Sequence, residues 1–221
     1  MMEEVLVFLK PDGVIRRYIG ARTVKEFLDA SFEIRYFGEI SPRREFIATK
    51  HYIQHKGAFF YNWLVNYVTS SHLLVFILAE DNIIREIRAS LGGTIPEKAD
   101  YNSIRGKYGI WGGINVAHAS DNAENGKREL EIWKELLTQN KQDCTEEAKA
   151  YVFKYINFPM IDTMRYREIS KQILNEEICE NEARSVFIDL LLKETDFDSE
   201  TVLRFAEIMV RNVSIRETEV K

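Results

Sequence analysis

A histidine at position 118 is the strongest candidate for a reacting group in this sequence. It stands in the segment Asn115-Val116-Ala117-His118-Ala119-Ser120-Asp121, which has the pattern of a short apolar strand followed by a helix start. An imidazole is largely neutral near pH 7 and can form a covalent phosphoryl intermediate when an acid holds its second nitrogen. Glu129, on the helix expected to fold back along this strand, is the candidate acid. The alternative, a structural histidine bonded to backbone, is the commoner role for a lone histidine.

Further polar groups lie where the expected elements end. Lys10 ends the first strand, Arg88 lies near the glycine-capped end of a helix, and Thr94 and Arg105 follow in irregular segments. Such groups can converge on a polyphosphate if the sheet brings these ends together. The sequence has neither a Gly-x-x-x-x-Gly-Lys-[Ser/Thr] nor a Gly-x-Gly-x-x-Gly segment, so phosphates would be bound in another way. Taken alone, each cation is more commonly a solvated surface charge.

The elements that would position these residues alternate between strands and helices. Apolar runs predict strands at 5–9, 32–40 and 72–78 and a short one before His118. Helical spacing predicts a helix after residues 10–13 and further helices at 43–54, 59–68 and 83–91, the last closed by Gly92-Gly93. Asp121 and Glu124 form a capping-box-like start for a helix that runs to about Leu137. This order is typical of an α+β sandwich with a ferredoxin-like antiparallel sheet.

Composition and charge narrow the classes of function. Of the 221 residues, 45% are hydrophobic, which excludes a chain that is disordered throughout. The formal net charge of -5 supplies no overall basic field, so nucleic acid is an unlikely partner. Residues 58–79 lack charged side chains, but Asn62, Asn66 and His72 interrupt the stretch. We therefore expect a helix, a turn and a buried strand there, and no membrane partner.

The cysteines and the N-terminus indicate a cytoplasmic protein. Cys144 and Cys179 are too few for a disulfide framework and have no metal-ligand spacing, so we expect reduced thiols. The acidic start Met1-Met2-Glu3-Glu4 leads directly into a strand and has the features of neither a secretory signal nor a transit peptide.

The chain changes character near residue 140. Every glycine lies between Gly13 and Gly126, every histidine lies in the same part, and the whole net charge belongs to the residues after 140. No strand or glycine-turn signal follows, whereas helices are expected at 145–155, 163–174, 182–192 and 199–210. We therefore predict two domains, residues 1–140 with the α+β sandwich and residues 141–221 as an all-α extension.

Two motifs resemble those of the nucleoside diphosphate kinase family. Lys10-Pro11-Asp12-Gly13 follows the first strand, and Asn115-x-x-His118-x-Ser120-Asp121 surrounds the candidate nucleophile. The resemblance extends from about residue 3 to about residue 137 without insertions. Other positions in the family's register are Tyr52, Phe60, Arg88, Thr94, Arg105 and Glu129.

The resemblance implies a kinase that transfers the γ-phosphoryl group of a nucleoside triphosphate to a nucleoside diphosphate through a phosphohistidine, in a ping-pong mechanism. His118 resembles the nucleophile, Glu129 the acid that orients it, and Ser120 the residue that helps to place this carboxylate. Lys10 and Tyr52 resemble the groups that meet the transferred phosphoryl group.

The remaining matched positions resemble nucleotide-binding groups. Arg88, Thr94 and Arg105 resemble a clamp on the other phosphates, and Phe60 resembles the aromatic residue on which the base stacks. Asn115, together with the lysine at the end of the first strand, resembles the pair at the ribose 3′-hydroxyl. The phosphates would carry Mg²⁺, with Asp121 making at most a water-mediated contact. The family also implies a homo-oligomer.

The chain departs from the family pattern beside several of these residues. Gly112 stands where the family has a bulky aliphatic residue against the base, which predicts a one-sided base site that a valine at this position would fill. The other departures are Ile95, Lys107, Ile114 and Ala119.

The helical tail is compatible with two hypotheses for the function of the whole chain. Since every assigned site residue lies at or before Glu129, we expect the tail to serve packing and oligomer contacts in an active kinase. The alternative is a catalytically weak nucleotide-binding module whose helical tail recruits a partner. The presence of His118, Lys10 and Glu129 favours the active enzyme.

Overall fold

An antiparallel sheet lies at the centre of the molecule, in the order β2-β3-β1-β4 within the described residues. The computed structural model describes residues 2–137 and 143–217. The strands are β1 (Met2–Leu9), β2 (Glu33–Ile40), β3 (Leu73–Asp81) and β4 (Ala117–Ala119). β1 runs between β3 and β4, so that Phe8 pairs with both Val75 and His118. The register therefore places His118 on the edge strand, close to the end of β1.

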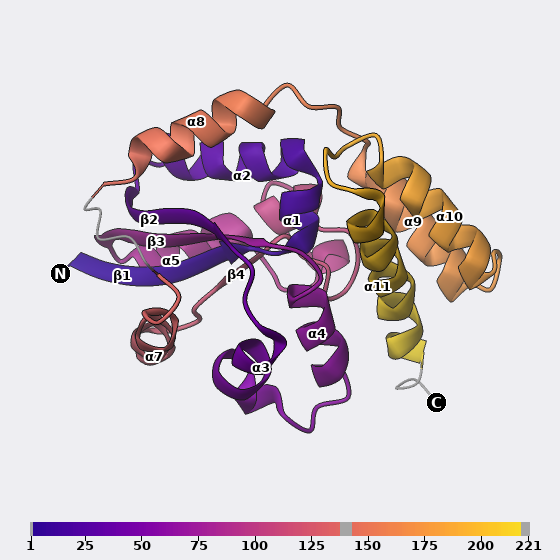
Figure 1. The fold of residues 1–221 in the computed structure, drawn as a ribbon, viewed down its shortest axis with the longest axis horizontal. Coiled ribbons are helices and arrows are strands. Elements are labelled where there is room, and N and C mark those ends of the chain that lie inside the picture. Colours follow the sequence, from indigo (N-terminus) through magenta and orange to yellow (C-terminus); the bar gives the residue numbers. More distant parts are fainter. Residues whose placement is uncertain (1, 138–142, 218–221) are drawn as a thin grey trace.

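Helices cover both faces of this sheet (Figure 1). α2 (Arg17–Asp29) and α8 (Thr145–Tyr155) lie on one side, whereas α3 (Arg44–Phe46) and α7 (Ala123–Trp133) lie on the other. This is the predicted α+β sandwich. The remaining elements before residue 138 are α1 (Pro11–Ile15), α4 (Tyr61–Val68), α5 (Ile83–Leu91), α6 (Ile104–Tyr108) and the helical turns Ile47–His51, Ile53–His55 and Pro96–Lys98.

Alternation along β1 divides its apolar side chains between two cores. The odd-numbered residues of 5–9 join a core with Phe27 of α2 and Tyr151 of α8. The even-numbered residues point to the opposite face and join a core with Trp133 of α7. All of these β1 side chains are fully buried. At about 1.5–3 kcal/mol for each large aliphatic side chain, this burial stabilises β1 as the scaffold of the site.

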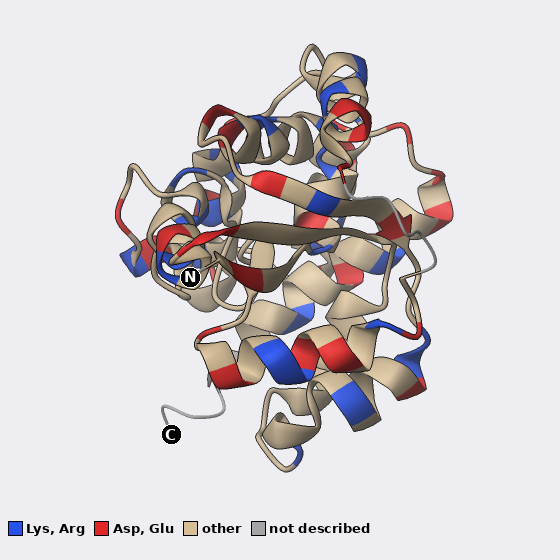
Figure 2. Ribbon diagram, turned by 90° about the vertical axis from the view of Figure 1, so that its left-hand side faces the viewer, with Lys and Arg blue, Asp and Glu red and all other residues tan. Residues whose placement is uncertain are grey.

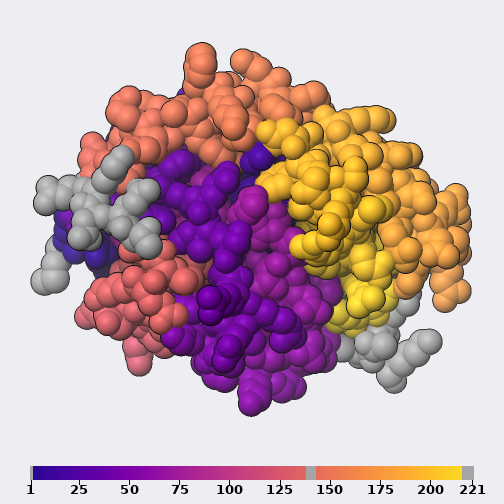
Figure 3. Space-filling view, in the orientation of Figure 1, coloured from indigo at the N-terminus to yellow at the C-terminus, as the bar shows by residue number. Residues whose placement is uncertain are grey.

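Residues 145–217 form the predicted helical extension and pack against the sandwich. Its elements after α8 are α9 (Thr163–Leu174), α10 (Glu180–Leu191) and α11 (Ser199–Glu217). Phe187, Phe205 and Met209 share one apolar core with Trp63 and Tyr67 of α4. In the space-filling view, the yellow side chains of α11 adjoin the purple surface of the preceding part directly (Figure 3). The predicted boundary at residue 140 lies outside the described residues.

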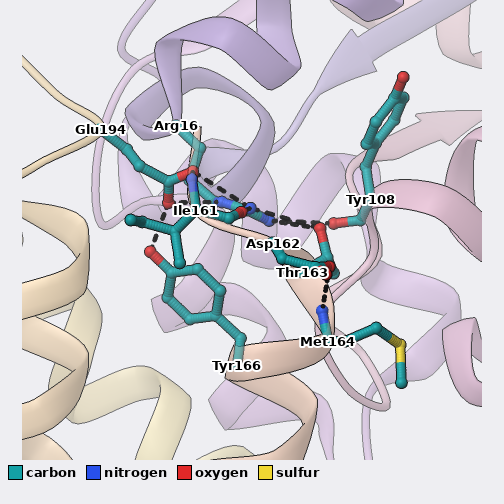
Figure 4. A network of polar contacts seen from close by, with 8 residues as sticks. All are labelled: Arg16, Tyr108, Ile161, Asp162, Thr163, Met164, Tyr166 and Glu194. Atoms are coloured by element: carbon teal, nitrogen blue, oxygen red, sulfur yellow. Dashed lines mark hydrogen bonds and ion pairs between the residues drawn. The ribbon is translucent and has the colours of Figure 1, made fainter. Parts of the chain in front are cut away.

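A buried ion pair joins the start of the chain to the tail (Figure 4). The side chains of Arg16 and Glu194 are each 1% exposed, and Arg16 Nε donates to Glu194 Oε2 at 2.9 Å. Arg16 also donates to Ile161 O at 2.9 Å and to Thr163 Oγ1 at 3.3 Å. The Tyr166 hydroxyl donates to Glu194 in turn. A buried charge pair with additional hydrogen bonds holds α9 and the segment after α10 against α1.

Some predicted elements differ in detail from those in the structure. The helix expected at 43–54 is interrupted, because Tyr52 N donates to Ile47 O in a π-type turn that ends at the cavity described below. Asn122, rather than Asp121, caps α7, since Asn122 Oδ1 accepts from Asn125 N at 2.9 Å. In the tail, α11 continues past residue 210 as far as Glu217.

Charged residues are mixed over the surface. In Figure 2, Lys and Arg alternate with Asp and Glu along the same helices, with no extended face of one sign in that view. The uncharged stretch 58–79 contains α4 and β3 up to Ala79, in agreement with the predicted helix and buried strand. Among the described helices, none combines the length and the apolar character needed to cross a bilayer.

Candidate active site

Residues 10–13 fix the backbone that leads into β4. Lys10 N donates to Val116 O and Asp12 Oδ2 accepts from Val116 N, both at 2.8 Å. Val116 has a φ of 71°, a left-handed conformation that costs a β-branched residue on the order of 1–3 kcal/mol. A Cβ on Gly13 would come within 2.9 Å of Val116 O, which accounts for the glycine. The motif after β1 thus aims the strand that carries His118.

His118 is held by a carboxylate from α7. Its Nε2 lies 2.8 Å from Glu129 Oε2, and Ser120 Oγ donates to the same oxygen at 2.6 Å. The Phe8 ring stacks on the imidazole with the centroids 4.7 Å apart. The carboxylate favours the tautomer with its hydrogen on Nε2, so the lone pair of the neutral ring is on Nδ1. The geometry suits an oriented nitrogen nucleophile.

The acid in this pair is ionised despite its burial. Burial alone would raise the pKa of Glu129, but the positive charge of a protonated His118 and the hydrogen bonds from His118 and Ser120 outweigh it and lower this pKa to about 2. The Glu129 side chain is only 3% exposed. An ionised carboxylate at this place stabilises positive charge that develops on the imidazole.

Lys10 is a buried amine that lines the same cavity as the imidazole of His118. It is 6% exposed, and its Nζ donates to Asn115 Oδ1 at 2.7 Å. Asn115 Nδ2 donates to Thr94 O at 2.8 Å, so the loop after α5 is tied to the same pair. Burial, aided by repulsion from Arg105, lowers the pKa of Lys10 to about 7 against the attraction of Asp12. An anion in the cavity would restore the full charge of this ammonium group.

Arg88 and Arg105, the two arginines predicted to bind phosphates, differ in their exposure to solvent. Arg105 is 9% exposed and donates to Gly92 O at 2.9 Å and to Ala117 O at 2.8 Å, which supports β4 as well. Its buried Nε has no partner among the described residues. Burial, followed by repulsion from Arg88, lowers the pKa of Arg105 to about 10. Arg88 lies exposed in the last turn of α5. Two cations that repel each other across a cavity favour an anion between them.

The π-type turn brings two aromatic residues to the same place. Tyr52 is 4% exposed, and burial raises the pKa of its hydroxyl, so it remains a neutral donor. His51 is fully buried, its ring centroid is 4.7 Å from that of His118, and its Nδ1 accepts from Trp133 Nε1 at 3.2 Å. Burial lowers the pKa of His51 well below 6.5. The sequence analysis did not predict that His51 lies beside His118. Its position directly before Tyr52 was the only feature of the sequence that pointed to this.

A cavity of about 570 Å³ brings the predicted site residues together. Ser120 lies behind it, on the carboxylate that holds the imidazole. The predicted residues that line the cavity are Lys10, Tyr52, Phe60, Arg88, Thr94, Arg105, Asn115, His118, Asp121 and Glu129.

The cavity also has lining residues that sequence reasoning missed. Asn212 and Ile215 reach it from α11, so the helical extension contributes to the cavity lining. Gly112 lies on the cavity wall with a φ of 57°, a conformation that a valine would strain. The positive φ counts against the valine that we expected to fill this place, and α11 contributes side chains to the same cavity. The one-sided base site itself stays a prediction. No periodicity in the sequence distinguishes residues 212 and 215 from ordinary packing positions.

The structure also shows where the other residues that depart from the family pattern lie. Ile95 lines the cavity, Ile114 is 1% exposed, and Ala119 lies in β4 opposite Val7. Lys107 Nζ lies 3.3 Å from Glu26 Oε1.

The residues around the cavity fit a magnesium ion carried by phosphates better than one held by the protein. Asp121 is exposed on the cavity lining, and a hydrogen bond from Asn125 lowers the pKa of its carboxyl. Such a hard oxygen ligand suits a water-mediated contact to Mg²⁺. Donor atoms of His51, His118 and Glu129 lie within 4.8 Å of one another, but two imidazoles and one carboxylate do not form the oxygen-rich set that Mg²⁺ prefers.

Comparison with known proteins matches the first part of this chain to one family. The family model described as nucleoside diphosphate kinase matches residues 3–136. The chain is 36% identical over 132 residues to the nucleoside diphosphate kinase of Clostridium perfringens, covering 60% of this chain and 91% of the relative. It is 37% identical over 133 residues to that of Methanocaldococcus jannaschii, covering 60% and 94%.

Solved structures agree with these sequences. The nucleoside diphosphate kinase of Encephalitozoon cuniculi superposes with a TM-score of 0.58 at 27% identity, over 68% of this chain and 99% of that one. That of Aquifex aeolicus superposes with a TM-score of 0.56 at 26% identity, over 60% and 94%. The matched family model ends at residue 136, so the helices α8–α11 lie beyond it. This chain belongs to the nucleoside diphosphate kinase family.

Proposed function

We propose that this protein is an active nucleoside diphosphate kinase that works through a phosphohistidine on His118. The observation that carries the proposal is the imidazole, which lines the cavity while its Nε2 is held at 2.8 Å by the ionised Glu129. Lys10, Arg88 and Arg105 line the same cavity. A fixed nucleophile and convergent cations suffice for phosphoryl transfer, which depends mainly on positioning and on stabilised charge.

The reaction has two half-reactions of opposite direction. In the first, the Nδ1 lone pair of His118 attacks the γ-phosphorus, the bond from that phosphorus to the β,γ-bridging oxygen breaks, and the nucleoside diphosphate leaves with the electron pair. The ring becomes positively charged, and Glu129 stabilises this charge through the Nε2 hydrogen. In the second, a terminal phosphate oxygen of another nucleoside diphosphate attacks the same phosphorus, and the N–P bond breaks.

The surrounding groups act on the charge of the phosphates. Lys10 and the Tyr52 hydroxyl donate to the transferred group, and Arg88, Thr94 and Arg105 hold the remaining phosphates. Mg²⁺ bound to the nucleotide supplies further charge neutralisation. Asn115 and the ammonium group of Lys10, which donates to it, contact the ribose 3′-hydroxyl. The Phe60 ring stacks on the base.

Two-substrate initial-rate kinetics test this function. With ATP as donor and GDP as acceptor, double-reciprocal plots at several fixed GDP concentrations should be parallel, as the ping-pong mechanism requires. His118→Asn should abolish turnover, whereas His72→Asn, directly before β3 and outside the cavity, should retain it. Nucleotide binding without turnover in the parent would instead favour the weak interaction module.

The assembly and location of the protein are part of the same proposal. We expect a homo-oligomer, which sedimentation of the full chain would measure. We also propose a cytoplasmic location, because two cysteines, Cys144 and Cys179, are too few for a disulfide framework. Cell fractionation would test this location.

A further inference from the structure

α11 is held against two elements that line the cavity, α4 and the turn at residues 111–114. Toward α4, Trp63 Nε1 donates to Ile208 O at 3.1 Å. Phe205 and Met209 pack in the same core as Trp63. α11 runs beside α4 in the ribbon view (Figure 1). The helix is therefore seated on α4 by a buried hydrogen bond and apolar packing.

Asn212 ties the same helix to the turn at 111–114. Its Oδ1 accepts from Gly113 N at 3.3 Å, and its Nδ2 donates to Trp111 O at 2.9 Å. A Cβ on Gly113 would come within 2.5 Å of the Trp63 ring, so the turn and α4 already touch there. A large side chain at residue 113 has no room, and residue 112 is a glycine with positive φ. The turn itself therefore contributes no bulky wall to the cavity.

Ile215 is placed to supply that wall. It follows Asn212 by three residues and so lies on the same face of α11. It lines the cavity together with the apolar side chains of Phe60, Trp63 and Leu64, which come from α4 and its first flanking residue. The cations of the proposed phosphate site lie elsewhere: Lys10 directly follows β1, Arg88 lies in α5 and Arg105 lies in α6. The cavity lining thus includes an apolar group of side chains on elements separate from those that carry the cations.

We propose that Ile215, from the helical extension of the same chain, contacts the nucleobase and determines nucleotide affinity. This inference rests on the proposed function, since it assumes that the cavity takes a nucleotide. An apolar wall binds the face of any base without reading its edge, and the two hydrogen bonds of Asn212 go to backbone. The extension therefore strengthens binding of purine and pyrimidine nucleotides alike.

Calorimetric titration with two ligands tests the contact. ADP has a base and tripolyphosphate has none, so only the affinity for ADP should depend on the side chain of Ile215. Ile215→Ala should weaken ADP binding by about fourfold for each methyl-sized group that the base covers, and leave tripolyphosphate binding unchanged. Ile215→Leu, with the same number of carbons, should retain most of the ADP affinity. Leu203→Ala, on an α11 side chain that is 50% exposed, is the matched control.

The outcomes separate this inference from the function on which it rests. Unchanged ADP affinity in Ile215→Ala, or an equal loss for ADP and tripolyphosphate, would overturn the base contact. UDP should lose affinity in the same variant as ADP does, and an effect confined to one base would overturn the claim of general affinity. Failure of the parent to bind ADP or to become phosphorylated by ATP would overturn the proposed kinase itself.

Discussion

Replacing Glu194 with glutamine should lower the free energy of unfolding by about 3–5 kcal/mol, because it leaves the buried Arg16 guanidinium without a counter-charge. Each of these two side chains is only 1% exposed. Arg16 Nε and Nη2 donate to the two carboxylate oxygens at 2.9 and 3.3 Å. Ile161 N and the Tyr166 hydroxyl donate to the same carboxylate. Glutamine keeps the shape but removes the charge and turns an NH₂ group toward these donors.

Urea unfolding, followed by tryptophan fluorescence and extrapolated linearly to water, measures this loss. Glu200→Gln is the matched control within the tail. Glu200 pairs with Arg204 at 2.9 Å, but their side chains are 85% and 51% exposed, so this substitution should cost no more than about 1 kcal/mol. If Glu194→Gln cost as little as Glu200→Gln, the reasoning that a buried charge pair holds the tail in place would be refuted.

Three further predictions concern the cavity and its surroundings. Arg88→Ala should lower kcat/KM about 10- to 100-fold, since a charge-assisted phosphate contact is worth about 1.5–3 kcal/mol, whereas Arg85→Ala, exposed on the same helix, should have no effect; equal rates in the two variants would place the phosphates elsewhere. Because the pKa of Lys10 is about 7, ADP binding one pH unit above this value should take up a proton, measured as a binding heat that depends on the buffer; Lys10→Met should lose this dependence, and its absence in the parent would contradict the assignment. Since the pKa of buried His51 lies well below 6.5, only the unfolded chain binds this proton near that pH, so stability should fall as the pH drops below 6.5, by up to about 1.4 kcal/mol per pH unit. Urea unfolding should show a smaller fall in His51→Gln, and an equal fall in both proteins would count against the buried neutral ring.

The chemistry of the site could be predicted because it depends on residue types at the ends of regular elements. Lys10 after β1, His118 in β4 and Arg88 at the end of α5 were identifiable from the apolar patterns that precede them. The register of β1 with β4 then brings the first two together, as the motifs implied. The spacing from His118 to Glu129 follows from one strand end and about two turns of helix, so that contact was predictable as well.

Contacts between distant segments could not be predicted in the same way. Arg16 and Glu194 are 178 residues apart, and each alone looks like an ordinary surface charge. Asn212 and Ile215 look like packing positions of an amphipathic helix, because nothing local shows that α11 docks beside the 111–114 turn. The helical pattern of the sequence before Tyr52 also carries no signal of the π-type turn that interrupts the helix there.

The most direct test of the central claim is the chemical identity of the phosphorylated enzyme. The full chain is mixed with γ-labelled ATP and Mg²⁺ without an acceptor, and the labelled peptide is mapped. We predict a single acid-labile, base-stable label on His118, no label in His118→Asn, and rapid release of the label when GDP is added. The same acid-labile label in His118→Asn would contradict the account, because the phosphoryl group would then be carried by another residue.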